Sequence, residues 1–247
     1  MRTTQLITQY IQALLFAAIG LRTVRGWLRT RDRKQAHLAV ATVLFAANSL
    51  IGAINTTLYN SALGQQPPRL DSIISGAVLL SSVFAFILFL TDFIPTPRWL
   101  VSTAAAITVI VIVGNAIERP DLRFDPTKGI VHIAGVHNFI GYRTWIGFLL
   151  GVLVVAFGIL WLAFFVFGLR VHGLARFRMM SIAGGFFLLF VVIGLLPRLL
   201  FGNPSAKTIR DLVNVLSYVA LGTAPLLFLG FAPPKWVTRR FNGNLSN

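Results

Sequence analysis

The sequence has no cysteine and few acidic residues. Its 247 residues include 22 Lys and Arg but only seven Asp and Glu. Without cysteine there are no disulfides, thiolate metal sites or cysteine nucleophiles. Charged residues make up 12% of the chain and hydrophobic residues 56%, whereas about a quarter of the residues in soluble domains are charged. The sequence therefore predicts an integral membrane protein.

Histidine is also scarce, and none lies inside an apolar segment. His37 and His172 flank such segments, and His132 and His137 lie in a polar loop. Haem or metal ligands in a helix bundle would face inward at helical spacing, so neither group is expected. His132 and His137 could hold a metal ion with Asp125, although ordinary loop histidines are the simpler interpretation. We predict no cofactor, no metal and no catalytic residue, so the chain is not expected to be an enzyme.

Seven apolar runs are each long enough to cross a bilayer. They predict helices at Gln5–Leu21, His37–Leu58, Leu70–Phe93, Trp99–Ile117, Phe139–Leu169, Phe177–Phe201 and Thr208–Phe231. The predicted fold is therefore an all-α, polytopic membrane protein with seven transmembrane helices. We assign residues 1–241 to this seven-helix domain and residues 242–247 to a polar tail.

Basic residues predict the orientation. The segment Leu21–His37 carries five arginines and one lysine against one acid, and short loops of this kind remain in the cytoplasm. Counting crossings from that loop places 13 of the 22 basic residues inside, with two of the seven acids. We predict an N-out, C-in membrane protein whose basic loops contact anionic lipid headgroups. Nucleic acid is not an expected partner, because the charges flank apolar runs.

Polar residues within the helices gather toward the predicted outer surface. Asn48, Gly52, Asn55 and Tyr59 recur at helical spacing, as do Gln5, Gln9 and Gln12. The residues chosen as candidate ligand contacts are Asn55, Tyr59, Asp71, Arg198, Asp211, Asn214 and Tyr218.

Two interpretations of these polar residues remain open. They can hold helices together through hydrogen bonds worth about 0.6 to 2 kcal/mol each. Alternatively, they line an outward-facing cavity between the second, third, sixth and seventh helices, with Arg198 paired to Asp211 or Asp71. The long loop Glu118–Asn138 would cover such a cavity, and its apolar part GIVHIAGV could form a hairpin or an interfacial turn. Gly147 and Gly151 form a small-residue pair that favours helix packing.

Three motifs resemble the N-terminal seven-helix membrane module of bacterial sensor proteins. They are TDFIPTPRWL at Thr91–Leu100, GLARFRMMSIAGG at Gly173–Gly185 and GFAPPKWVTRRF at Gly230–Phe241. In that family the module precedes cytoplasmic GAF, histidine kinase, diguanylate cyclase or PP2C-type phosphatase domains. The resemblance implies a sensor module of the bacterial inner membrane. Together with the polar helix faces, it leads us to expect binding of a small or lipid-like ligand and transmission of the change to the cytoplasmic side.

We expect no such output domain in this sequence, so the chain is expected either to act on a protein partner or to have a role other than signalling. A homo-oligomer is also a possible assembly. Two other functions remain open: a structural subunit of a larger membrane complex, and a transporter component.

Overall fold

A computed structural model of the chain describes residues 2–58, 69–94, 96–118, 120–125, 130–135, 142–201 and 206–242, with side chains over 7–55, 57–58, 70–71, 73–94, 96–118, 144–196, 215, 218–219 and 221–241. The helices are α1 (Arg2–Thr30), α2 (Arg33–Leu58), α3 (Arg69–Thr91), α4 (Arg98–Ile117), α5 (Tyr142–Arg170), α6 (Gly173–Phe201), α7 (Ala206–Phe231) and α8 (Lys235–Asn242), and the strands are β1 (Pro120–Asp125) and β2 (Ile130–Gly135).

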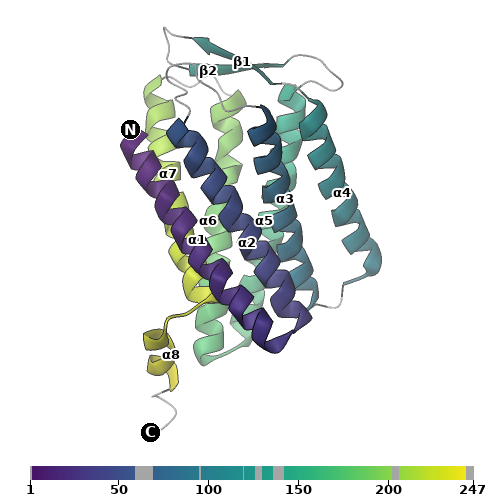
Figure 1. Ribbon diagram of the computed structural model, residues 1–247, viewed down its shortest axis with the longest axis vertical. Coiled ribbons are helices and arrows are strands. Elements are labelled where there is room, and N and C mark those ends of the chain that lie inside the picture. The colour runs from purple at the N-terminus through teal and green to yellow at the C-terminus, as the bar shows by residue number, and fades with distance from the viewer. Residues whose placement is uncertain are drawn as a thin grey trace.

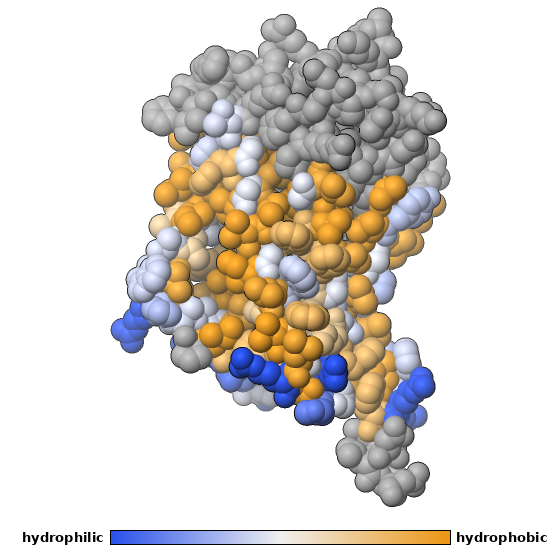
Figure 2. Space-filling view, turned by 180° about the vertical axis from the view of Figure 1, so that it is seen from behind, coloured by the Kyte–Doolittle hydropathy of each residue, from blue (hydrophilic) through white to orange (hydrophobic). Residues whose placement is uncertain are grey.

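The described chain is a polytopic helical membrane protein. Helices α1 to α6 each contain a stretch long and apolar enough to cross a bilayer, and the described apolar part of α7 is Leu221–Phe231. Figure 2 shows hydrophobic side chains across the middle of one face, with hydrophilic ones gathered at the end from which α8 projects. Large apolar side chains on that surface need a lipid environment, since in water they would favour aggregation.

The long helices form a closed ring with one helix outside it (Figure 1). Going around the ring, α1, α2, α3, α5, α6 and α7 are successive neighbours, and α7 packs against α1. Helix α4 lies outside the ring, against α3 and α5. The β1–β2 hairpin lies beyond one end of the bundle, called here the hairpin end, and α8 lies beyond the other, called the basic end.

Strands β1 and β2 form a hairpin in the long loop, but it is not the hairpin expected within the apolar half. The pairing is antiparallel and runs from Pro120 opposite Gly135 to Asp125 opposite Ile130. The acidic half of the loop therefore pairs with the apolar half, whereas the prediction had placed the hairpin within the apolar half alone. The all-α prediction applies to the bundle but not to this connection.

The basic segment Leu21–His37 is mostly helical, which corrects its assignment as a loop. Helix α1 continues nine residues past the predicted end, to Thr30, because most residues of this segment are adequate helix formers and none is proline. The next residue, Arg31, terminates the helix. Its φ of 53° is left-handed, and its N–H donates to the Trp27 carbonyl over 2.7 Å. Asp32 then caps α2, accepting a hydrogen bond of 3.2 Å from the Lys34 N–H.

Side-chain hydrogen bonds connect α1, α2 and α3 at several depths. Thr23 and Thr42 share a buried bond of 2.8 Å between α1 and α2. The Ser82 hydroxyl donates to the Ala41 carbonyl over 2.8 Å, which connects α3 to α2. Such bonds are worth about 0.6 kcal/mol each in a membrane. Polar residues inside this bundle therefore do hold helices together, as the packing interpretation proposed.

Helix α4 is fixed mainly near the hairpin end. A side chain at Gly114 would overlap the buried indole of Trp145 on α5. A side chain at Gly76 on α3 would lie 2.7 Å from the Asn115 amide nitrogen. Val111 of α4 is buried, whereas Val109 and Ile110 face outward and are 59% and 56% exposed. These two close approaches therefore position α4 beside the ring.

Candidate functional site

The described candidate residues lie near the hairpin end or on the outer surface. Asn55 on α2 and Asp71 on α3 are each half-buried, and Tyr218 on α7 is 59% exposed. Tyr59 lies outside the described residues. The side chains of Arg198, Asp211 and Asn214 lie outside the described set, so the Arg198–Asp211 pair stays a prediction.

An interior cavity of about 250 Å³ lies on the axis of the ring. Every helix of the ring contributes to its wall. The described lining residues are Gln9, Gln12, Phe16, Phe45, Asn48, Ser49, Gly52, Leu79, Phe157, Leu189, Ile193 and Thr223. Its volume is close to the lower end, roughly 300 Å³, of small-molecule sites. It includes two helices, α1 and α5, that the predicted cavity did not.

The polar part of the cavity wall comes mainly from α1 and α2. The Asn48 amide oxygen accepts a bond of 2.9 Å from Ser75, and the Ser49 hydroxyl donates to the Phe45 carbonyl over 3.0 Å. The amide oxygen of Gln9 is buried and has no hydrogen-bond partner among the described residues. Leaving such an acceptor unpaired costs about 1 to 3 kcal/mol. The cavity wall therefore favours an occupant that donates a hydrogen bond to Gln9.

The spacing of polar residues correctly identified two of the helix faces that line the cavity, on α1 and α2. The residue of these faces that was picked as a ligand contact and is described, Asn55, is not part of the lining. Gln9 and Gln12 on α1, with Asn48 and Gly52 on α2, belong to the polar sets expected to share one helix face. Asn55 belongs to the same α2 set but is absent from the described lining. The apolar lining residues of α3, α5 and α6 carry no polar signal, so spacing of polar residues could not find them.

A group of buried phenylalanines closes the cavity toward the basic end. Phe45 and Phe157 of the wall have ring centroids 6.4 Å from Phe86 and 6.1 Å from Phe186, respectively. Phe86 and Phe186 contact each other at 5.2 Å, and Phe231 of α7 lies 5.8 Å from Phe86. Such pairs add about 0.5 to 1.5 kcal/mol beyond burial. We call Phe86, Phe89, Phe164, Phe186 and Phe231 the aromatic cluster.

Two arginines hold the end of α7 just beyond the aromatic cluster. Arg178 Nε on α6 donates to the Gly230 carbonyl over 2.9 Å, and Arg22 Nη1 on α1 donates to the Ala232 carbonyl over 3.1 Å. A side chain at Gly230 would overlap Ile182 on α6. The end of α7 is thus fixed to both of its neighbours where α8 begins.

A second polar contact ties α2 to the turn after α3. His37 Nδ1 lies 2.8 Å from an Asp92 carboxylate oxygen, and Arg33 Nε lies 3.9 Å from the other oxygen. Asp92 belongs to the first sensor-like motif, while Arg178 and Gly230 belong to the second and third. All three motifs therefore contribute contacts at the basic end.

Within the described residues, no three His, Asp or Glu side chains are grouped closely enough to hold a metal ion. The side chains of His132, His137 and Asp125, the metal alternative, lie outside that set. Neither the protein-family models nor the curated proteins compared with this chain give a match.

Proposed function

We propose that this chain is a seven-helix sensor of the bacterial inner membrane whose interior cavity binds a small neutral ligand. The observation that carries the proposal is the cavity of about 250 Å³. Every helix of the ring lines it, and the Gln9 amide oxygen in its wall has no partner within the described part of the chain. A module with such a cavity can convert binding into movement, because the occupant contacts all six helices at once.

The lining favours a neutral ligand. Its described polar groups are Gln9, Gln12, Asn48, Ser49 and Thr223, none of which is charged. Amides and hydroxyls both donate and accept hydrogen bonds, whereas the remaining lining is aliphatic or aromatic. We therefore propose a ligand with one hydrogen-bonding end and one apolar end, which agrees with the small or lipid-like ligand expected from the polar helix faces.

Helix α7 is the proposed path from the cavity to the basic end. Thr223 lines the cavity, and Pro225 follows two residues later inside the helix. Proline has no N–H, so the Leu221 carbonyl loses its usual partner and the helix bends more easily there. Phe231 lies at the far end of the same helix, in the aromatic cluster. Movement at Thr223 would shift Phe231 and, beyond it, α8.

The proposed orientation puts the basic end in the cytoplasm. The turns at Arg31, between α1 and α2, and at His172, between α5 and α6, lie at that end, as do α8 and most of the basic residues assigned to the inside. Seven crossings require α7 to span as well, which its length of 26 residues permits. With the N-terminus outside, α8 is then available to cytoplasmic partners.

The alternatives fit the cavity less well. Transport needs a polar route through both halves of the bundle, yet buried phenylalanines fill the described interior between the cavity and the basic end. A purely structural subunit would not need a cavity with an unpaired amide, because its polar residues would be paired with one another. A structural subunit is therefore our second candidate. The hydrogen bonds of Thr23 and Ser82 favour it, since they show polar side chains that serve only to join helices.

Filling the cavity tests the proposal. Gly52 lines the cavity, and no atom lies within 4 Å of where its Cβ would be. Gly52→Leu should therefore fold, occupy the space and exclude the ligand. Extraction of the purified wild-type protein followed by untargeted mass spectrometry should give a small neutral compound that Gly52→Leu lacks.

Gly151→Leu on α5 is the matched control, since Gly151 also has open space but faces away from the cavity. It should retain the compound. At a hundredfold excess over Kd, the isolated compound should stabilise the wild type by about 2.7 kcal/mol, and it should change hydrogen exchange in α8. Identical extracts from the wild type and Gly52→Leu would refute the cavity, whereas binding without a change in α8 would refute the relay.

A further inference from the structure

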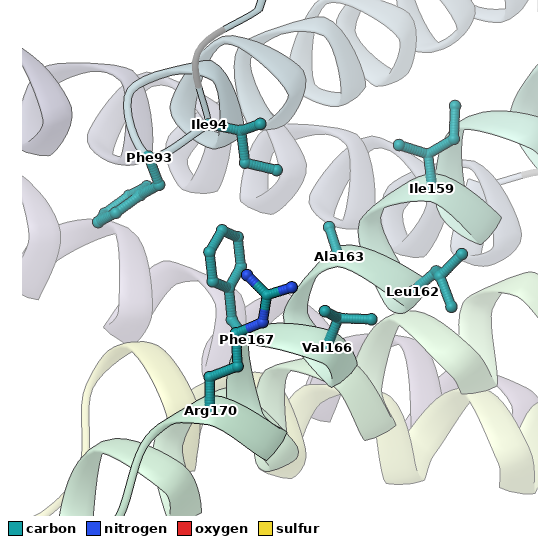
Figure 3. A pocket seen from close by; sticks show the side chains of 8 residues that line it. All are labelled: Phe93, Ile94, Ile159, Leu162, Ala163, Val166, Phe167 and Arg170. Atoms are coloured by element: carbon teal, nitrogen blue, oxygen red, sulfur yellow. The ribbon is translucent and has the colours of Figure 1, made fainter.

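A groove runs along the outside of the ring between α4 and α5. Its middle part has a volume of about 420 Å³ and is enclosed by α3, α4 and α5. Toward the basic end it meets a second space of about 500 Å³ at Ile159, which lines both. Figure 3 shows this second space between α5 and the turn that carries Phe93 and Ile94. We call the two spaces together the α4–α5 groove.

The α4–α5 groove is apolar over most of its length. Leu162, Ala163 and Val166 of α5 line the part near the basic end, facing Ile94. Gly151 lines the middle part, and no atom lies within 4 Å of the place of its Cβ. The sequence had suggested that Gly151 packs against another helix, but here it leaves open space. A hydrocarbon chain fits such a space better than water, because the wall offers almost no hydrogen bonds.

Positive charge lies at one end of the α4–α5 groove. The guanidinium of Arg170 is directed along Phe167 into the space below Phe93 and Ile94 (Figure 3). Arg170 forms no ion pair with any described residue. The salt bridges found there join Asp92 to Arg33 and to His37. On the other side, the Lys34 ammonium lies 4.9 Å from the centre of the Phe93 ring. Two cations therefore flank the end of an apolar channel.

The depth of the groove matches one leaflet of a bilayer. Ile159 and Arg170 are eleven residues apart on α5, which corresponds to about 16 Å at 1.5 Å per residue. Half of the hydrocarbon thickness is about 15 Å. With Arg170 at the level of the phosphates, Ile159 lies near the middle of the membrane.

We propose that the α4–α5 groove is a binding site for one anionic phospholipid of the leaflet at the basic end. One of its acyl chains lies along α5 from Arg170 past Ala163 to Ile159, and its phosphate contacts Arg170, with Lys34 nearby. The bound lipid fills the space between α5 and the turn that leads into α4, and so helps to hold α4 in place. This site is separate from the interior cavity and does not depend on the ligand proposed for it.

Native mass spectrometry of protein from nanodiscs that contain equal phosphatidylglycerol and phosphatidylcholine tests the site. The wild type should retain one phosphatidylglycerol in preference to phosphatidylcholine. Arg170→Gln should lower that preference about fivefold, the factor expected from roughly 1 kcal/mol of attraction per basic residue. Ala163→Leu should reduce retention of both lipids, because Ala163 lines the part of the groove that the acyl chain occupies and the larger side chain fills it.

Arg239→Gln on α8 and Gly52→Leu in the interior cavity are the matched controls. Arg239 is exposed, so its loss removes the same charge without touching the groove. Both controls should retain phosphatidylglycerol as the wild type does, and a thermal unfolding measurement should show that all four variants are folded. An equal loss of preference in Arg239→Gln would overturn the site in favour of general attraction. A dimer without retained lipid would assign the groove to a second copy of the chain.

Discussion

Gly230 and Pro234 are four residues apart, and this spacing explains why Arg178 matters. In a continuing helix the Gly230 carbonyl would accept from the N–H of residue 234, but proline has none. Arg178 supplies the missing donor over 2.9 Å. The second and third sensor-like motifs thus contain two halves of one contact. This contact gives both motifs a structural role that does not depend on any signal.

Replacing Arg178 by leucine should destabilise the protein. The Gly230 carbonyl would lose its partner in a mostly apolar setting, at a cost of about 1 to 3 kcal/mol. Arg176→Leu is the matched control, since Arg176 is exposed on the same helix and its side chain has no described contact. Equilibrium unfolding in detergent, followed by tryptophan fluorescence, would measure both. Equal losses in the two variants would show that the carbonyl contact is not the cause.

At the scale of whole helices, the sequence predicted well which long helices exist and in what order they follow. It predicted poorly where each helix ends and how the helices pack. Apolar length placed α2 and α4 almost as found, because hydropathy changes sharply at their ends. The continuation of α1 to Thr30 was missed, since basic residues are compatible with both a helix and a cytoplasmic loop. Helix α8 was also missed, because its eight amphipathic residues are too few and too polar to form an apolar run.

The cavity shows the same limit. Spacing of amides identified the polar faces of α1 and α2, yet choosing which members face the interior needs the rotation of each helix. That rotation is set by packing, for example by Gly20 of α1 against Val43 of α2. Helix α5 illustrates this further, since Phe157 lines the cavity while Gly151 and Ile159 line the α4–α5 groove. Nothing in its nearly uniform apolar sequence separates the two faces.

The attachment of α4 gives a prediction at this scale. Gly114→Ala would place a methyl group against Trp145, and such overpacking costs about 1 to 3 kcal/mol. Amide exchange should rise along α4 and remain unchanged in α1 and α2. Gly52→Ala, where the added Cβ meets open space, should leave exchange in α4 unchanged. Uniform acceleration throughout the bundle in Gly114→Ala would mean that α4 does not move as a separate element.

On the scale of the whole molecule, the two proposed binding sites both lie on the path toward the basic end of the bundle. The interior cavity lies in the middle of the ring, the aromatic cluster lies beyond it, and the contacts of Arg22, Arg178 and Asp92 lie at the basic end. The phosphate end of the α4–α5 groove lies there too. Ligand in the cavity and lipid in the groove would therefore influence the same cytoplasmic surface, if the basic end is inside.

That orientation can be measured directly, because the chain has no cysteine to give background labelling. We expect single cysteines at Arg31 and His172, in the turns after α1 and α5, to react with an impermeant maleimide only after the cells are permeabilised. Lys128→Cys, in the loop between β1 and β2, should react in intact cells. The physical reason is the excess of Lys and Arg near the first two positions.

Arg239→Cys on α8 decides between six and seven crossings. If α7 spans, this residue lies on the same side as Arg31 and reacts only after permeabilisation. If α7 does not span, it reacts in intact cells, and the described helices α1 to α6 are then the only crossings among those tested. Each variant is also labelled after detergent solubilisation, which shows that its thiol is reachable. Labelling of Arg31→Cys in intact cells would reverse the orientation and place α8, with both arginine contacts, outside the cytoplasm.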